Sequence, residues 1–295
     1  MAFKTIRENY KGTPSYMVGN GFKVSNYIPG IRGYSGNELS PFILLDYNAP
    51  HYFEPSVYRR GVGEHPHRGF ETVSIAYEGE IEHRDSSGGG GVIQAGDVQW
   101  MTAAAGLMHD EFQSENFARS GGVQHFIQLW VNLPAAYKMV APGYQAITAS
   151  EIPNVQLDDK GSIVRIIAGN YEGIRGAASS FTPVNMFDFR LQPSSDIMFQ
   201  SPAGYNSFLL ITKGHVCINE ELEASHGEMV VFEPDFEDIK LEASEESMIF
   251  FAAGQPINEP IERYGPFVMN NKSEILQAIE DIQTGQFGFI APMEQ

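Results

Sequence analysis

The sequence predicts an all-β protein built from two small barrels, and three observations lead to this prediction. Short runs of β-branched and aromatic residues recur along the 295-residue chain, separated by turns that use many of its 30 glycines and 17 prolines. Many short strands at such spacing are typical of sandwiches and barrels. Similar strand-and-turn units also occur twice, and one helical pattern interrupts the strands near the C-terminus.

The expected strands lie in segments that are rich in Val, Ile, Phe, Tyr and Trp and are bounded by Gly, Asp, Asn and Ser. In chain order they are 72–78, 91–94, 98–102, 123–131, 163–168, 184–191, 207–212, 215–218, 229–232 and 247–252.

A helix is expected over residues 273–284. Ile275, Ala278, Ile279 and Ile282 recur at i, i+3, i+4 and i+7, which is the spacing of one helix face. Asn271 or Ser273 can cap its start, and Gly285 stands where a helix commonly ends. We expect this helix to dock its apolar face on a sheet.

The repeat consists of a strand, a glycine turn and a second strand. Gly79 and Gly96 punctuate the first copy, and Gly214 and Gly227 punctuate the second. Two copies of one barrel explain the pattern, with a boundary in the proline- and glycine-bearing stretch around residues 134–160. We therefore expect two domains, 1–140 and 141–295, with the C-terminal helix in the second.

Charge and cysteine content exclude several classes of protein. The chain has 19 basic and 37 acidic side chains, for a net charge of −18, and such a surface repels a phosphate backbone, so direct nucleic-acid binding is not expected. The single cysteine, Cys217, cannot form an internal disulfide. No apolar run approaches the roughly 20 residues that span a bilayer, so we expect no membrane contact and a cytoplasmic protein.

The most informative motif is His65-Pro-His67, followed by Glu71. In an extended segment residues of equal parity share a face, so the two imidazoles can chelate one metal ion. About 40 residues later His109-Asp-Glu111 repeats the i, i+2 spacing. Two hairpins of one barrel can present these groups to one point, and nitrogen and carboxylate donors suit Fe(II), Mn, Ni, Cu or Zn.

Simpler interpretations compete with this one. A lone His-Pro-His is more often a solvated turn than a ligand pair, and Glu71 can replace Glu111 as the carboxylate. We expect His83 to lie at a solvated hairpin edge. His125 can line the barrel or serve as an ordinary hydrogen-bonded core histidine.

The second copy serves as an internal control. Counting from its glycines by the first copy's spacing gives Gln200, Pro202 and Lys240 in place of His65, His67 and His109. None of the three is a plausible ligand, so metal chemistry is expected in the first domain only.

The chain resembles the pirin family, two-domain proteins of the cupin superfamily, over nearly its whole length. The resemblance is carried by residues 65–72, 79–85, 96–103, 109–111, 128–134, 258–261 and 265–270. It implies two cupin barrels of the double-stranded β-helix, or jelly-roll, type with short helices. It also implies a metal held by His65, His67, His109 and Glu111, with a degenerate second barrel.

One departure stands close to the motif. Pirins often carry Gly-Arg-Gly before the third histidine, whereas this chain has Ala104-Ala105-Gly106. Because no ligand changes, the missing arginine bears on substrate identity more than on metal binding.

For function, the resemblance implies either of two activities. Several pirins are associated with quercetin 2,3-dioxygenase activity, so the first expectation is an oxidoreductase that uses Fe(II) or a similar metal, a flavonol-like substrate and dioxygen. Glu111, where it is not fixed on the metal, can act as the base. The second is a non-catalytic, metal-dependent regulator that binds protein partners. A cupin isomerase or a metal-free relic ranks below both, since all four ligands are present.

Overall fold

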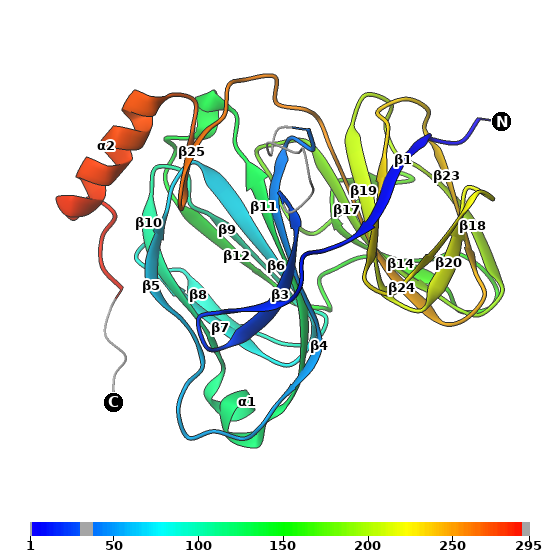
Figure 1. Ribbon diagram of the computed structural model, residues 1–295, viewed down its shortest axis with the longest axis horizontal. Helices are drawn as coiled ribbons and strands as arrows, with labels where there is room; N and C mark the ends of the chain where they lie inside the picture. The colour runs from blue at the N-terminus through cyan, green and yellow to red at the C-terminus, as the bar shows by residue number, and fades with distance from the viewer. Residues whose placement is uncertain (1, 30–37, 291–295) are drawn as a thin grey trace. The chain divides into compact units, whose positions relative to one another are not determined.

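The computed structural model describes residues 2–29 and 38–290, and the chain divides into two compact units (Figure 1). The histidine unit, as we call it, comprises Pro14–Pro29, Phe42–Ala149 and Ile257–Gln295. The apolar unit comprises Met1–Thr13, Gly30–Pro41 and Ser150–Pro256. Relative to the expected division at residues 140 and 141, the first strand and the C-terminal helix each belong to the other unit.

The histidine unit is built from a seven-stranded and a four-stranded antiparallel sheet. The seven-stranded sheet has the order β12-β9-β6-β11-β4-β3-β2, and the four-stranded sheet has the order β5-β10-β7-β8. The strands are β2 (Tyr16–Val18), β3 (Phe22–Ile28), β4 (Phe42–Phe53), β5 (Gly61–His67), β6 (Phe70–Glu78), β7 (Ile81–Asp85), β8 (Gly90–Ile93), β9 (Val98–Thr102), β10 (Leu107–Gln113), β11 (Gly122–Asn132), β12 (Gly143–Ile147) and the hairpin β25 (Glu262–Tyr264) with β26 (Phe267–Met269).

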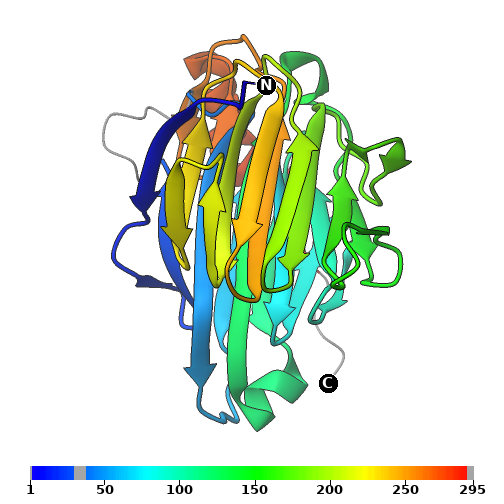
Figure 2. The ribbon, with the colours of Figure 1, turned by 90° about the vertical axis from the view of Figure 1, so that its right-hand side faces the viewer.

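The apolar unit repeats this plan. Its seven-stranded sheet has the order β1-β22-β19-β24-β17-β14-β13, its four-stranded sheet the order β18-β23-β20-β21, and β15 pairs with β16. Figure 2 faces this unit, with β1 in dark blue at one edge. The strands are β1 (Ile6–Lys11), β13 (Asn154–Gln156), β14 (Ile163–Ala168), β15 (Asn170–Tyr171), β16 (Ile174–Arg175), β17 (Val184–Leu191), β18 (Ser195–Gln200), β19 (Asn206–Lys213), β20 (His215–Ile218), β21 (Leu222–Ser225), β22 (Glu228–Phe232), β23 (Asp238–Ala243) and β24 (Ser247–Gly254).

The space between the two sheets of the apolar unit is filled by hydrocarbon. Paired residues on neighbouring strands form rows, and one row consists of Phe187, Phe251, Leu209 and Val230. All four are buried in a single apolar cluster that also receives side chains from the facing sheet, including Phe199 of β18. This core stabilises the unit through hydrophobic burial and close packing.

Helices are few. The helix α1 (Glu115–Ser120) begins at Ser114, whose side chain accepts a hydrogen bond from the Phe117 N–H, and a 3-10 turn covers Ala135–Tyr137. The C-terminal helix α2 (Lys272–Gln283) is capped by Asn271. Its Ile275 and Ala278 are buried against β26 and the following tail, including Phe287.

The expected all-β architecture of two barrels is confirmed, and each of the ten expected strands coincides with an observed strand. The expected helix at 273–284 is confirmed within one residue at each end. Within the described parts of the chain, 2–29 and 38–290, no helix is long and apolar enough to cross a membrane.

Candidate metal centre

Three histidines meet between the two sheets of the histidine unit. His65 and His67 lie on β5, and His109 lies on the neighbouring strand β10, where it pairs with His65 in the antiparallel register. The ring centroids are 4.1 Å apart for His65 and His109, 4.6 Å for His67 and His109, and 4.9 Å for His65 and His67. One ring nitrogen from each lies within 4.8 Å of the others. Strand alternation thus brings the predicted histidines to a common point.

Two ring nitrogens of this cluster lack a hydrogen-bond partner among the described residues. Among the described residues, His67 Nδ1 and His109 Nε2 are buried without a hydrogen bond, whereas His65 Nδ1 lies 2.8 Å from the Gly63 carbonyl oxygen. Burial, and then the neighbouring histidines, lower the pKa of His67 and of His109 well below the usual value. Both imidazoles are therefore neutral, which is the form that binds a metal.

Glu111 approaches the same region from β10. One of its carboxylate oxygens groups with ring nitrogens of His83 and His109 within 4.8 Å. Gln99 Nε2 donates to Glu111 Oε1, and Gln128 Nε2 donates to Oε2, both at 2.9 Å. Each carboxylate oxygen is thus held by one amide of the facing seven-stranded sheet, which fixes the plane of the carboxylate.

These amides belong to a polar row that crosses the seven-stranded sheet. Asn26, Asp46, Gln128, Ser74 and Gln99 are consecutive register partners on β3, β4, β11, β6 and β9. Residues opposite one another in a sheet share a face, and the row therefore presents amides and a carboxylate inward. The four-residue row on the corresponding strands of the apolar unit is entirely hydrocarbon.

His83 is the residue that sequence reasoning placed wrongly. The expected solvated edge is in fact the interior: β7 lies between β10 and β8, and Ile81, His83 and Asp85 all face inward. His83 Nε2 lies 3.1 Å from Asp85 Oδ2, and His83 Nδ1 lies 3.4 Å from His109 Nδ1. The Tyr144 ring stacks on His83 with centroids 4.9 Å apart. His83 thus contacts the histidine cluster through His109, from the neighbouring strand β7.

Glu71 and His125 both have partners away from the histidine cluster. Glu71 is fully buried, accepts a hydrogen bond from Thr102 at 2.7 Å, and joins no metal-type group among the described residues. His125 is buried and lies 3.0 Å from the Tyr47 hydroxyl. Its environment is that of an ordinary hydrogen-bonded core histidine.

A cavity of about 250 Å³ opens beside the histidines. Most of its wall is apolar, and the polar groups are His65, His67, Glu111, Gln128 and Asp46. The remaining lining residues are Val18, Phe22, Val24, Val62, Phe126, Trp130 and Pro266. An apolar cavity with a few convergent polar groups is typical of a small-molecule site.

Family comparison agrees with this architecture. A family model described as Pirin matches residues 21–131, and one described as the Pirin C-terminal cupin domain matches residues 186–288. The chain belongs to the pirin family.

Individual relatives match this pirin over nearly its full length. A crystal structure of a protein named quercetin 2,3-dioxygenase from Acinetobacter baumannii is 45% identical with a TM-score of 0.93, covering 98% of this chain and 100% of the other. A Pseudomonas aeruginosa protein provisionally named a quercetin 2,3-dioxygenase is 41% identical over 96% of this chain and 98% of its own. Pirin-1 of Arabidopsis thaliana is 37% identical over 92% and 90%.

The loop at residues 104–106, which lacks the arginine of the usual pirin pattern, contacts Arg68. Arg68, next to His67, donates from Nε to the Ala105 carbonyl oxygen at 2.6 Å. Its guanidinium also forms an ion pair with Asp281 of α2 at 2.7 Å and lies 4.6 Å from the Phe287 ring centroid. The chain of this pirin thus connects the loop before His109 to its C-terminal helix.

The apolar unit of this pirin offers no comparable cluster among its described residues. Its inward-facing residues on β18 and β23 include Phe199, Ile239 and Leu241. Gln200 and Lys240, which the spacing from the glycines predicted as counterparts, are their outward-facing neighbours. The counted positions Gln200 and Lys240 were therefore one residue away from the interior, where Phe199, Ile239 and Leu241 are hydrocarbon. The buried neighbour of the third counted position, Pro202, is Ser201.

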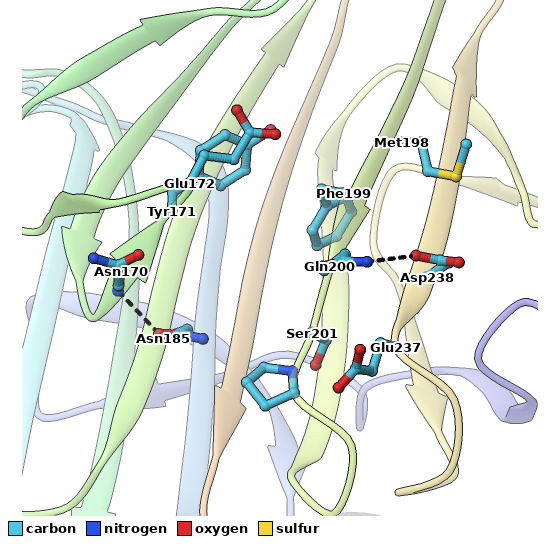
Figure 3. Close-up of a pocket in the computed structure, with 11 residues that line it drawn as sticks. Asn170, Tyr171, Glu172, Asn185, Met198, Phe199, Gln200, Ser201, Glu237 and Asp238 are labelled. Carbon is cyan, nitrogen blue, oxygen red and sulfur yellow. Dashed lines mark hydrogen bonds between the residues drawn. The ribbon is translucent and has the colours of Figure 1, made fainter.

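A hollow in the apolar unit also lacks histidine among its lining residues. This hollow, one of the hollows of the unit, measures about 600 Å³, and Figure 3 shows Asn170 and Asn185 on one side with Gln200 and Asp238 on the other. The Asn170 N–H donates to Asn185 Oδ1 at 3.1 Å, and Gln200 Nε2 donates to Asp238 Oδ1 at 3.0 Å. These polar groups bond to one another and do not converge on a point.

Proposed function

We propose that this pirin holds one divalent transition metal through His65, His67, His109 and Glu111, and that it is a quercetin 2,3-dioxygenase-type oxidoreductase. Its substrate is a small flavonol-like aromatic, which it oxidises with dioxygen. Fe(II) is the first candidate for the metal, followed by Mn, Ni, Cu and Zn.

One observation carries the metal site. Two buried ring nitrogens, His67 Nδ1 and His109 Nε2, have no hydrogen-bond partner among the described residues, beside a third imidazole within 4.8 Å. A buried polar atom without a partner costs free energy, and a metal ion bound in the cluster would give buried ring nitrogens a partner. The donor set therefore fits a borderline divalent cation.

The residues around the cavity determine what else binds there. Phe126, Trp130 and Val62 offer apolar surface for an aromatic ring next to the histidines. A redox-active metal, when bound, supplies a Lewis acid and a path for electrons between an aromatic substrate and dioxygen. The names of the Acinetobacter and Pseudomonas relatives support this reaction class.

Glu111 is the group that we assign to proton transfer. Gln99 and Gln128 each occupy one lone-pair direction of its carboxylate, and each oxygen retains a second one. One of these can face the metal while another accepts the proton of a substrate hydroxyl. The two amides hold the carboxylate in position for either contact.

The test is elemental analysis of the purified protein, followed by oxygen-electrode assays with quercetin on the iron-, manganese- and copper-loaded forms. We expect stoichiometric metal and oxygen uptake that depends on quercetin. His67→Ala and His109→Ala should abolish both, whereas the matched control His226→Ala, in the apolar unit, should preserve both. Metal retained in both cluster variants would refute the assignment.

The second candidate function is a metal-dependent regulator that binds a protein partner. The net charge of −18 favours a partner with a basic surface. Stoichiometric metal without oxygen uptake on any flavonol or catechol, together with capture of a basic partner only by the metal-loaded protein, would favour this function over the enzyme.

A further inference from the structure

Asp46 is a cavity residue that the proposed reaction does not use. It lies on β4 and is 9% exposed, and it lines the same cavity as His65, His67 and Glu111. Glu111 and Asp46 are the two carboxyl groups among the residues that line this cavity. Buried carboxyl groups are rare unless they are paired or bind something.

The contacts of Asp46 satisfy one of its two oxygens. Asn26 Nδ2 donates to Asp46 Oδ1 at 2.7 Å, and the same amide also donates to the carbonyl oxygens of Ile28 and Leu45 at 3.0 and 3.4 Å. Asn26 is thereby fixed in orientation. Among the described residues no side chain donates to Asp46 Oδ2, which leaves this oxygen as an acceptor at the cavity wall.

The position of Asp46 relative to Glu111 follows from the register of the seven-stranded sheet. Asp46 is the register partner of Gln128, and Gln128 holds Glu111. Neighbouring strands lie about 5 Å apart, so Asp46 lies one strand further along the seven-stranded sheet than Gln128, the amide that holds Glu111. His65, His67 and Asp46 line the same cavity, so a single ligand there can contact the histidines and Asp46 together.

The surroundings of Asp46 make its carboxylate a strong hydrogen-bond acceptor. Burial raises the pKa of Asp46 to about 6, although the Asn26 hydrogen bond and the nearby Arg263 act in the opposite direction. The carboxyl group is therefore ionised at neutral pH while remaining poorly hydrated. An ionised oxygen in such surroundings forms hydrogen bonds stronger than those of a neutral acceptor.

The apolar walls of the cavity suit a flat ring. Phe22 and Phe126 meet edge to face with centroids 5.3 Å apart, and Trp130 lies 5.0 Å from the His67 ring. All three side chains line the cavity. A ligand that matches apolar walls and one carboxylate is an aromatic ring that carries a hydroxyl donor.

We infer that Asp46 is a substrate-binding residue whose Oδ2 accepts a hydrogen bond from a ring hydroxyl of the substrate. This inference rests on the proposed function, because it takes the substrate to be a hydroxylated aromatic. It makes Asp46 the residue that selects among flavonols by their hydroxyl pattern.

The test compares two ligands on the metal-loaded protein without oxygen. Quercetin carries ring hydroxyls that 3-hydroxyflavone lacks, and binding of each is measured by calorimetry and by quenching of tryptophan fluorescence. The variants are Asp46→Leu, which removes the acceptor, and Asp46→Asn, which keeps the shape and the Asn26 contact. Asp238→Leu, the same change in the hollow of Figure 3, is the matched control.

We expect the wild type and the control to prefer quercetin, and the preference to fall about tenfold or more in Asp46→Leu, as loss of a hydrogen bond to a charged group requires. Asp46→Asn should lie between them, and metal content should not change. An undiminished preference in both Asp46 variants overturns the inference and leaves the proposed function standing. A wild type that binds neither flavonol overturns both.

Discussion

Gln128 Nε2 lies 2.9 Å from Glu111 Oε2, so an amide on one sheet of the histidine unit holds a carboxylate on the facing sheet. Gln99 does the same at the other oxygen, also at 2.9 Å. Outer contacts of this kind orient metal ligands and are worth roughly 10–100-fold in metal affinity. They give the first prediction.

Replacing Gln128 or Gln99 by leucine should weaken metal binding by roughly 10–100-fold, because Glu111 loses one of its two fixed donors. Competition with a chelator of known affinity measures the effect. Gln200→Leu, a glutamine of the apolar unit, is the control and should bind as the wild type does. Equal affinities in all three variants would show that Glu111 is positioned without these amides.

Asp46 gives a prediction about pH. Burial raises its folded-state pKa from 3.8 to about 6, so the folded protein binds the proton more tightly than the unfolded chain does. The resulting stability is fully present below pH 3.8 and is lost as the pH rises through about 6. Relative to Asp46→Asn, the wild type should lose up to about 1.4 kcal/mol of unfolding free energy per pH unit in this window.

Urea unfolding of the metal-free wild type and Asp46→Asn between about pH 4 and 7 measures this difference. The subtraction removes the titration of the other carboxyl groups, which both proteins share. A difference that is constant with pH would show that Asp46 titrates with its unfolded-state pKa.

We predict that the ion pair between Arg68 and Asp281 stabilises the docking of α2. The Arg68 side chain is 4% exposed, so Asp281→Asn leaves a buried guanidinium without its counter-charge. We expect a loss of roughly 1–3 kcal/mol and faster proteolysis within α2, read out by mass spectrometry of the released fragments.

The control for this change is Glu115→Gln, in the exposed pair of Glu115 with Arg119, whose side chains are 66% and 71% exposed. Exposed pairs contribute about 0–1 kcal/mol. If Asp281→Asn is no more destabilising than this control, solvent already screens the Arg68 pair.

A substitution at Phe251 tests whether the interior of the apolar unit and that of the histidine unit have separate roles. It is fully buried in the apolar unit, with the Phe199 ring 5.0 Å away and the Phe187 ring 5.7 Å away. Phe251→Ala should cost about 3–5 kcal/mol through lost burial and a new cavity, while metal content of the folded protein stays at the wild-type value. Loss of metal in the folded variant would mean that the apolar unit contributes to the site.

Much of the fold could be predicted from the sequence because runs and periodic patterns of apolar residues indicate the strands and the helix directly. Strand β9 and helix α2 coincide with their predicted ranges to within one residue. Strand β4 was not predicted, because Asp46, Asn48 and Pro50 interrupt its apolar run. Asp46 lines the cavity and Asn48 is fully buried, so this strand is interior in spite of its polar residues.

The candidate site was predictable only in part. His65, His67 and His109 are found from spacing, because period-2 alternation fixes the face that they share. His83 and Asp85 follow the same parity as Ile81, but polar side chains in such a pattern normally indicate the solvent side. The contacts of the Gln99 and Gln128 amides with Glu111 could not be predicted from the sequence. They depend on the register between strands, and sequence separation does not specify which residues of neighbouring strands lie opposite one another.

His65 and His109 are opposite one another on strands whose backbone hydrogen bonds do not involve any ion. For the proposed metal site we therefore expect the barrel to remain folded when the metal is removed, unlike small zinc domains that unfold on chelation. We then expect exchange in the native state, so that the metal found in a given preparation reflects the ions offered during growth and purification as much as the preference of the donors. Activity comparisons between preparations should accordingly be made on protein stripped and reloaded with a single ion.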